Sequence, residues 1–249
     1  MTAVDVVILT WNDAALLDHA VASVLAQVDV TVSVVVVDNG STPPARVVDD
    51  ARVQLIRSAE NLGVGGGRNL GARAGTAEFV CFLDSDAALH PGALRTLVAP
   101  MLADDRVGLT APVFTGQAPE ASGGIAPTFT DKVRRACNRT DVYRRTPGQG
   151  EGDWWSVEFV IGACQVLRRE AFVAVGGLDD TAAFGPEDVD FCLRVGGRGW
   201  RIVQVAGAGC DHPPRRAFRG LATRRGFRHT RAVLRHLWRH RRVRAGVAA

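Results

Sequence analysis

The sequence lacks the long apolar run that a membrane-spanning helix requires. Such a helix needs about 20 apolar residues in succession, whereas the longest apolar runs here have the length of a strand, as at residues 34–37. The N-terminus also lacks a basic segment followed by an apolar stretch and a small-residue cleavage site, the marks of a secretory signal. We therefore expect a cytoplasmic protein, with membrane contact only at its periphery.

Cysteines are few, and none of the five forms a Cys-x-x-Cys pair. An odd and scattered set of cysteines indicates neither a disulfide framework nor a structural zinc site. We expect reduced thiols in the core or near the surface.

Acidic residues are absent from the C-terminal end. Residues 215–249 hold 12 arginines and no acid, which leaves 18 basic and 26 acidic side chains in residues 1–214, a net charge of −8. Apolar residues lie among the arginines, some at helical spacing, and a basic amphipathic helix is typical of peripheral membrane binding. A solvated helix that packs on the body is the alternative. Nucleic acid is the least favoured partner, because the acidic body offers no continuing basic groove.

The first hundred residues alternate short β-branched runs with helix-like stretches. This alternation is typical of an α/β fold with a mostly parallel central sheet and helices on both faces. Strands are predicted near residues 4–10, 32–38, 53–57, 78–84, 108–113 and 201–205, with further regular structure over 157–167, and helices near 13–27, 66–74, 169–175 and 187–195. Residues 115–153 are rich in Gly, Pro, Thr and charge, and we expect a long loop there.

Polar residues follow three of the predicted strands, in the segments Thr10-Trp11-Asn12, Asp38-Asn39-Gly40 and Asp84-Ser85-Asp86. Ligands of open α/β sheets bind at the carboxyl ends of strands, so we expect the three segments along one rim. In the last segment, Asp86 is expected at a Mg²⁺ or Mn²⁺ that bridges a diphosphate while Asp84 addresses the sugar or ribose; the alternative is a solvated acidic turn. Asp38 is either an acceptor for a pyrimidine ring N–H or the anchor of its own turn.

The glycine-rich segment 61–71 does not match the known phosphate-binding loops. It lacks Gly-x-Gly-x-x-Gly in register and the Lys-Ser/Thr of a P-loop, and Asp38 precedes the glycines instead of following them, which disfavours a dinucleotide enzyme. The glycines are expected to let a helix approach a nucleotide, with Arg68 offered to the diphosphate. The alternative is tight packing of the helix on the sheet, with Arg68 at the surface.

A second acidic cluster follows Pro186 at the start of a predicted helix. Glu187 and Asp188 suit the positive end of the helix dipole, which is one explanation of their presence. The other is a general base for an acceptor hydroxyl, with Asp188 as first candidate and Glu187 as second. Farther along, His212 follows the last predicted strand and is a candidate third metal ligand.

In this order the motifs resemble those of the family 2 glycosyltransferases, especially the bacterial rhamnosyltransferase-like branch. The motifs are Ile8-Leu9-Thr10-Trp11-Asn12, Val36-Val37-Asp38-Asn39-Gly40-Ser41, Asn61-Leu62-Gly63 through Asn69, Leu83-Asp84-Ser85-Asp86, Gly176-Gly177-Leu178-Asp179 and Glu187-Asp188-Val189-Asp190. The resemblance implies the GT-A nucleotide-diphospho-sugar transferase fold and transfer with inversion. It also implies a metal held by Asp84, Asp86 and His212, with Asp188 as the base.

The resemblance places Thr10, Asn12 and Asp38 at the nucleotide, and the expected donor-binding residues are these three with Asn39, Arg68, Asp84 and Ser85. On the acceptor side, Gly162 and Ala163 match a small-residue segment of the family. Trp154 and Trp155 are also expected there, because aromatic rings stack on sugars, with packing in the core as the alternative. The expected donor is a UDP or dTDP sugar, although Asp84-Ser85-Asp86 departs from the branch's common Asn-Pro-Asp, which weakens an assignment of dTDP-rhamnose. The acceptor is expected to be a hydroxyl of a glycan, of a lipid-linked molecule or of a small molecule.

We expect a catalytic domain over residues 1–214, with a nucleotide-binding half (1–114) and an acceptor-side half (115–214), followed by the basic tail (215–249). Two other functions remain open. A nucleotidyltransferase on the same fold would release pyrophosphate from a nucleoside triphosphate. A non-catalytic module would bind a sugar nucleotide or a membrane without turnover.

Overall fold

The computed structural model describes residues 1–128, 131, 143–181 and 187–213. The helices are α1 (Ala14–Leu25), α2 (Gly63–Ala74), α3 (Ala93–Ala103), α4 (Pro119–Ser122), α6 (Arg169–Ala174) and α7 (Glu187–Gly196). The strands are β1 (Thr2–Thr10), β2 (Val30–Asp38), β3 (Val53–Arg57), β4 (Phe79–Asp84), β5 (Ala88–Leu89), β6 (Val107–Pro112), β7 (Gly123–Gly124), β8 (Trp154–Val157), β9 (Phe159–Val160), β10 (Cys164–Arg168), β11 (Arg201–Val205) and β12 (Cys210–Asp211). The tail predicted for residues 215–249 lies outside the described residues.

Eight strands form the central sheet, in the order β3-β2-β1-β4-β10-β6-β11-β8. Strands β1 to β4 are parallel to one another, and β6 and β11 are parallel to each other. Strand β10 runs antiparallel between β4 and β6, and β8 is antiparallel at the edge. The sheet is therefore mostly parallel, as predicted, and it takes strands from both halves of the predicted catalytic domain.

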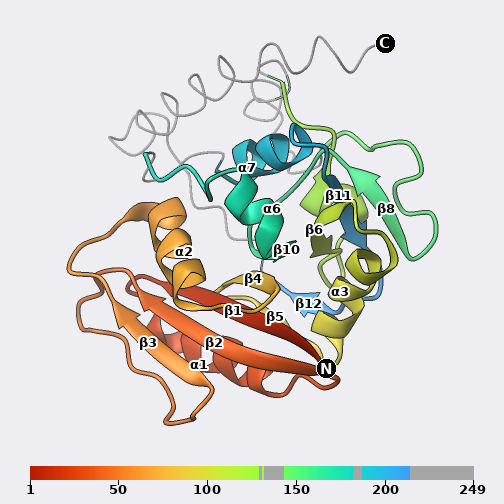
Figure 1. Ribbon diagram of the computed structural model, residues 1–249. Helices are drawn as coiled ribbons and strands as arrows, with labels where there is room; N and C mark the ends of the chain where they lie inside the picture. Colours follow the sequence, from red (N-terminus) through yellow and green to blue (C-terminus); the bar gives the residue numbers. More distant parts are fainter. Residues whose placement is uncertain (129–130, 132–142, 182–186, 214–249) are drawn as a thin grey trace.

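Helices cover both faces of this sheet, and Figure 1 shows α1 and α2 on opposite sides of β1, β2 and β3. Alternate residues of a strand point to opposite faces. Thus Val6 lies in one buried cluster with residues of α1 and α3, and its neighbour Val7 lies in the other with residues of α2, α6 and α7. The predicted two-sided covering of the sheet is confirmed, and none of the helices within the described residues is long and apolar enough to cross a membrane.

The glycines of α2 are explained by packing. A Cβ atom at Gly67 would collide with Leu9 of β1, and one at Gly71 would collide with Val7. At Gly65 the obstacle is the backbone carbonyl of Asp179, on the turn that precedes α7. These contacts support the packing alternative for the glycines. Helix α2 begins at Gly63, three residues before the predicted start.

Other predictions are corrected in detail. Helix α3 was not among the predicted elements, although Leu94, Leu97, Val98 and Met101 give it a buried face at helical spacing. The regular stretch expected over 157–167 is divided among β8, β9 and β10, with a break at residues 161–163. The long loop contains α4 and β7. Four cysteines, Cys81, Cys164, Cys192 and Cys210, are free and buried, as expected, and Cys137 lies outside the described residues.

Candidate active site

The carboxyl ends of three neighbouring strands meet at one rim of the sheet. Pairing of β1 with β2 sets Thr10 beside Asp38, and pairing of β1 with β4 sets Leu9 beside Asp84. The N–H of Asn39 donates to the carbonyl of Thr10 at 2.9 Å. The prediction that the three polar segments share one rim is therefore confirmed.

This rim borders a cleft with a volume of about 200 Å³. Four residues predicted for the donor or the metal line it: Asn39, Asp84, Ser85 and Asp86. Its other lining residues are Leu9, Trp11, Asp13, Asn61, Gly63 and Val64. Trp11, Asp13, Asn61 and Val64 were missed as site residues, although the first two lie in or beside the polar segment after β1 and the other two lie in the glycine-rich segment 61–71.

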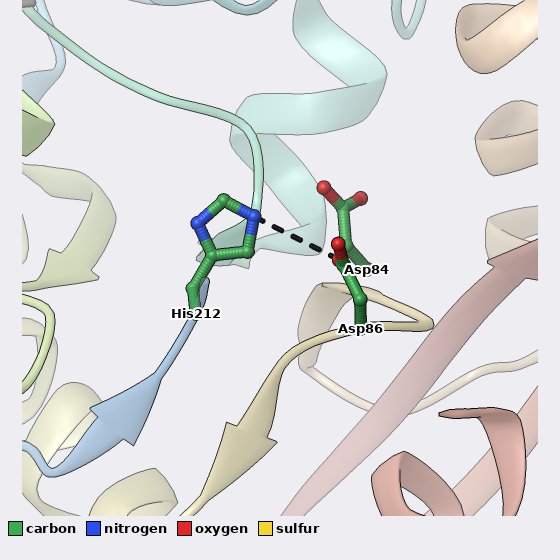
Figure 2. A group of neighbouring side chains, drawn as sticks. All are labelled: Asp84, Asp86 and His212. Carbon is green, nitrogen blue, oxygen red and sulfur yellow. Dashed lines mark ion pairs between the residues drawn. The ribbon is translucent and has the colours of Figure 1, made fainter. Parts of the chain in front are cut away.

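Two carboxylates and an imidazole form a cluster beside this cleft (Figure 2). Asp84, Asp86 and His212 each offer one ligand atom, and these atoms lie within 4.8 Å of one another. His212 Nε2 is 3.7 Å from Asp86 Oδ1. Two carboxylate oxygens and a ring nitrogen suit Mn²⁺ or Mg²⁺, Mn²⁺ being the better match for the nitrogen. The three residues predicted to hold a metal are thus brought together, and their chemistry fits such an ion.

A small two-stranded sheet explains how His212 reaches Asp86. Strand β5 begins two residues after Asp86, and β12 ends immediately before His212. These strands pair antiparallel, with Ala88 opposite Asp211. The ring of Phe114 packs against the imidazole at 5.2 Å between centroids, which limits the orientation of the ring.

Asp38 anchors the loop that follows β2. Its Oδ1 accepts the N–H of Ser41 and its Oδ2 that of Ala45, both at 2.9 Å, and its side chain is buried. Burial alone would raise the pKa of Asp38, but the hydrogen bonds from Ser41 and Ala45 outweigh it and hold the pKa below its ordinary value. The anchoring interpretation is supported by these bonds, and recognition of a nucleotide base by Asp38 stays a prediction.

The other predicted nucleotide residues also shape loops beside the cleft. Asn12 accepts the N–H of Thr42 at 2.8 Å and donates its own N–H to Ser41 Oγ at 3.0 Å. The side-chain oxygen of Asn39 accepts the N–H of Leu62 at 2.9 Å. Within the described part of the chain, the buried hydroxyl of Thr10 has no hydrogen-bond partner.

Arg68 lies buried beneath the metal cluster instead of at the surface. Its Nη2 donates to Asp84 Oδ1 at 2.6 Å and to the carbonyl of Gly162 at 2.8 Å. Its guanidinium carbon is 5.6 Å from the centroid of the Phe82 ring. The surface alternative for Arg68 is wrong, and its predicted contact with a diphosphate stays a prediction.

The start of α7 faces the same region. Glu187 and Asp188 are half-buried, and the Cβ of Asp188 is 3.5 Å from where a Cβ of Gly162 would be. Asp188 Oδ1 accepts the N–H of Val189 at 2.8 Å. Burial and then the negative charge of Asp188 raise the pKa of Glu187 to about 8. Asp188 therefore lies beside Gly162, which bonds to Arg68, and the positive charge of Arg68 acts against the rise in the pKa of Glu187.

The residues predicted for the acceptor side are divided by the structure. Gly162 bonds to Arg68, and Ala163 accepts the N–H of Asp84 at 2.9 Å. Trp154 and Trp155 lie on β8, four strands from β4, which is about 19 Å at the usual strand spacing. Trp155 is a core residue, so it is not available to stack on an acceptor. Trp154 is half-exposed, packed on Arg201, and apart from the cluster.

The order of site segments agrees with a known family. The family model described as Glycosyl transferase family 2 matches residues 5–176. The chain belongs to this family. The match includes the strand ends that carry Asp38, Asp84 and Asp86 but stops before Asp188 and His212, and the predicted resemblance is confirmed.

Relatives and solved structures agree with this membership. The N-acetylglucosaminyl-diphospho-decaprenol L-rhamnosyltransferase of Mycobacterium tuberculosis is 29% identical over 238 residues, which cover 83% of this chain and 75% of the relative. A mannosyltransferase from Pyrobaculum calidifontis in complex with GDP-Man and Mn²⁺ aligns with a TM-score of 0.61 at 20% identity, over 86% of this chain and 58% of that one. GalNAc-T7 with UDP, GalNAc and Mn²⁺ aligns with a TM-score of 0.63 at 17% identity, over 90% of this chain and 46% of that one. This family 2 chain has the GT-A fold.

Proposed function

We propose that this family 2 chain is an inverting, metal-dependent glycosyltransferase that moves a sugar from a nucleotide diphosphate to an acceptor hydroxyl. The observation that carries the proposal is the convergence of Asp84, Asp86 and His212 beside a cleft at the carboxyl rim of the sheet. The cluster is assembled from two distant parts of the chain, which a solvated acidic turn alone would not require.

The donor side is formed by the rim and the cleft. The two similar structures contain nucleotide or nucleotide sugar with Mn²⁺, which supports Mn²⁺ or Mg²⁺ and a sugar nucleotide for this chain. A divalent ion held by the cluster would neutralise the negative charge that develops on the departing diphosphate. The proposed donor is a UDP or dTDP sugar, with Asp38 and Asn39 on the side of the base. Within the described region, the buried hydroxyl of Thr10 has no intramolecular hydrogen bond. This supports a hydrogen bond from Thr10 to the donor.

Asp188 is the proposed general base. As the acceptor oxygen attacks the anomeric carbon from the face opposite the diphosphate, the carbon–oxygen bond to the diphosphate breaks and the hydroxyl proton passes to the Asp188 carboxylate. This sequence inverts the anomeric centre. Glu187, with a pKa of about 8, keeps its proton at neutral pH and is the poorer base.

The acceptor is proposed to be a hydroxyl of a glycan, of a lipid-linked molecule or of a small molecule. The name of the mycobacterial relative contains N-acetylglucosaminyl-diphospho-decaprenol, a lipid-linked sugar, which supports the lipid-linked class. Such an acceptor would place this chain at the inner face of a cell membrane. The basic tail, outside the described residues, is proposed to bind that surface, and residues 1–214 are proposed to form the catalytic domain.

A donor screen tests the proposal. UDP-, dTDP- and GDP-sugars are incubated with the full chain, with Mn²⁺, with Mg²⁺ or with a chelator, and sugar release or transfer is measured. We expect nucleoside diphosphate to be released only with metal, and a product of inverted anomeric configuration when an acceptor is found. Pyrophosphate release from a nucleoside triphosphate would favour a nucleotidyltransferase, and tight donor binding without turnover would favour a binding module.

A further inference from the structure

Arg68 of α2 joins the metal cluster to the segment between β9 and β10. It is 2% exposed, and its Nη2 bonds to both Asp84 Oδ1 and the Gly162 carbonyl. The same segment is fixed a second time, because the carbonyl of Ala163 accepts the Asp84 N–H. Asp84 is thus held from its side chain and its backbone by residues 162–163 and Arg68.

The two members of this ion pair differ in their access to solvent. The Asp84 side chain is 37% exposed, whereas that of Arg68 is 2% exposed. The guanidinium therefore approaches the carboxylate from the protein interior and uses Oδ1, while the carboxylate itself borders the cleft. A buried arginine with such contacts costs desolvation energy that packing alone does not require.

The second guanidinium nitrogen supplies an independent observation. Within the described residues, Nη1 of Arg68 is buried without a hydrogen-bond partner. A Cβ at Gly162 would be 2.7 Å from Nη1, so the absence of a side chain at Gly162 is what gives the guanidinium its place. A buried donor without a hydrogen-bond partner destabilises the folded state. The Arg68 guanidinium therefore keeps its buried position in spite of the cost to the stability of the fold.

We propose that Arg68 is a positioning residue, which orients the Asp84 carboxylate for the divalent ion, and that Gly162 is the space that permits it. This inference rests on the proposed metal-dependent function. Arg68 does not touch the ion or the donor in this role. It fixes the carboxylate from behind, as outer partners of metal ligands do, and loss of such partners typically weakens metal binding about 10–100-fold.

The positive charge of Arg68 should weaken metal binding, whereas its positioning of Asp84 should strengthen it. The two effects have opposite signs, so a measurement of Mn²⁺ affinity distinguishes them. A positive charge beside a metal ligand repels a cation, so a purely electrostatic account predicts tighter Mn²⁺ binding when the charge is removed. The positioning account predicts weaker binding. It also predicts weaker binding in Gly162→Ala, which keeps the charge but displaces the guanidinium.

The experiment is a titration of Mn²⁺ into the full chain without nucleotide sugar, with free Mn²⁺ measured by electron paramagnetic resonance. We expect the dissociation constant to rise about 10–100-fold in Arg68→Met, by less in Arg68→Lys, which keeps one bond, and measurably in Gly162→Ala. The thermal midpoint of each variant is measured in parallel. Gly162→Ala and Arg68→Lys change the side chains less than Arg68→Met does. Their Mn²⁺ affinities therefore still test the inference if Arg68→Met does not fold.

Two matched controls isolate the effect. Arg169→Lys alters another arginine–carboxylate pair of 2.6 Å, to Asp5, and Gly196→Ala adds a methyl group where the nearest atom is at an ordinary 3.5 Å. Both should bind Mn²⁺ like the wild type. Unchanged or tighter Mn²⁺ binding in folded Arg68 and Gly162 variants, or a wild type that binds no Mn²⁺, overturns the inference. Wild-type Mn²⁺ binding without sugar turnover on any donor would instead refute the proposed function alone.

Discussion

Two arginine–carboxylate pairs lie at opposite ends of the central sheet, and both have a closest distance of 2.6 Å. At the carboxyl end, Arg68 is buried and its partner Asp84 is 37% exposed. At the amino end of β4 the exposures are reversed, since Asp5 is 6% exposed and Arg169 is 20% exposed. The ion pair at the carboxyl end therefore leaves the Asp84 carboxylate open to the cleft, whereas the ion pair at the amino end buries the Asp5 carboxylate.

The partners of the two carboxylates explain the difference. Asp5 also accepts the N–H of Ala77 at 2.7 Å, so its charge is neutralised by the fold itself. Asp84 lies beside Asp86 and His212, where a further positive charge from an ion would be stabilising. We therefore expect ion pairs of equal length to serve stability at the amino end and ligand binding at the carboxyl end, and variants at each end should separate the two effects.

The largest expected effect is at the carboxyl end, in Asp188→Asn. Removal of a general base typically costs about 10²–10⁴-fold in rate, and the amide keeps the shape of the side chain. We expect transfer to fall by this factor while donor affinity and thermal midpoint remain close to wild type. The control is Glu170→Gln, which removes an exposed acid from the first turn of α6. Transfer at the wild-type rate by Asp188→Asn would remove it from the role of base.

The amino end should respond in stability alone, in Arg169→Met. Breaking one partner of a buried pair typically costs about 3–5 kcal/mol, because the other charge stays buried without compensation. Urea unfolding should show this loss, while Mn²⁺ affinity of the folded protein is unchanged. Asp50→Asn, at the exposed pair with Arg52, is the control and should change stability little. A change in Mn²⁺ affinity in Arg169→Met would contradict the separation of the two ends.

The metal cluster itself gives the next prediction, His212→Ala. Loss of a ligand should weaken Mn²⁺ binding at least as much as the 10–100-fold typical of an outer partner. His90→Ala is the matched control, because His90 immediately follows β5 and pairs with Asp211 at 3.0 Å without belonging to the cluster. Both titrations are made without donor. Equal Mn²⁺ affinity in His212→Ala and wild type would exclude the imidazole as a ligand.

The carboxyl end was the more predictable end from the sequence, since strand ends of a parallel sheet meet by topology. The rim at Thr10, Asp38 and Asp84 follows from apolar runs that stop at polar residues, and the sheet pairs them as expected. Arg68 was harder to place, because its burial depends on the space at Gly162, which is distant in sequence. Trp155 was assigned to an acceptor because aromatic residues suit sugars, but its indole N–H bonds to Gln204 in the core.

The smallest expected effect concerns the pH dependence of stability at Glu187. Its pKa is raised from 4.5 to about 8, chiefly by burial and then by Asp188, so the folded protein binds the proton more tightly than the unfolded chain. The resulting stabilisation is full below pH 4.5 and is lost as the pH rises towards 8.

Glu187→Gln cannot ionise and should escape this loss. In a chelator, we expect the variant to match the wild type at pH 4 and to be more stable at pH 9 by roughly 1–2 kcal/mol, a value reduced for solvent screening of a half-buried group. Urea unfolding at the two pH values measures the difference, with Glu170→Gln as the exposed control. A wild type whose stability does not decline relative to Glu187→Gln between these pH values would show that α7 begins in a more solvated place, and that proximity to Asp188 and Arg68 has no energetic consequence for Glu187.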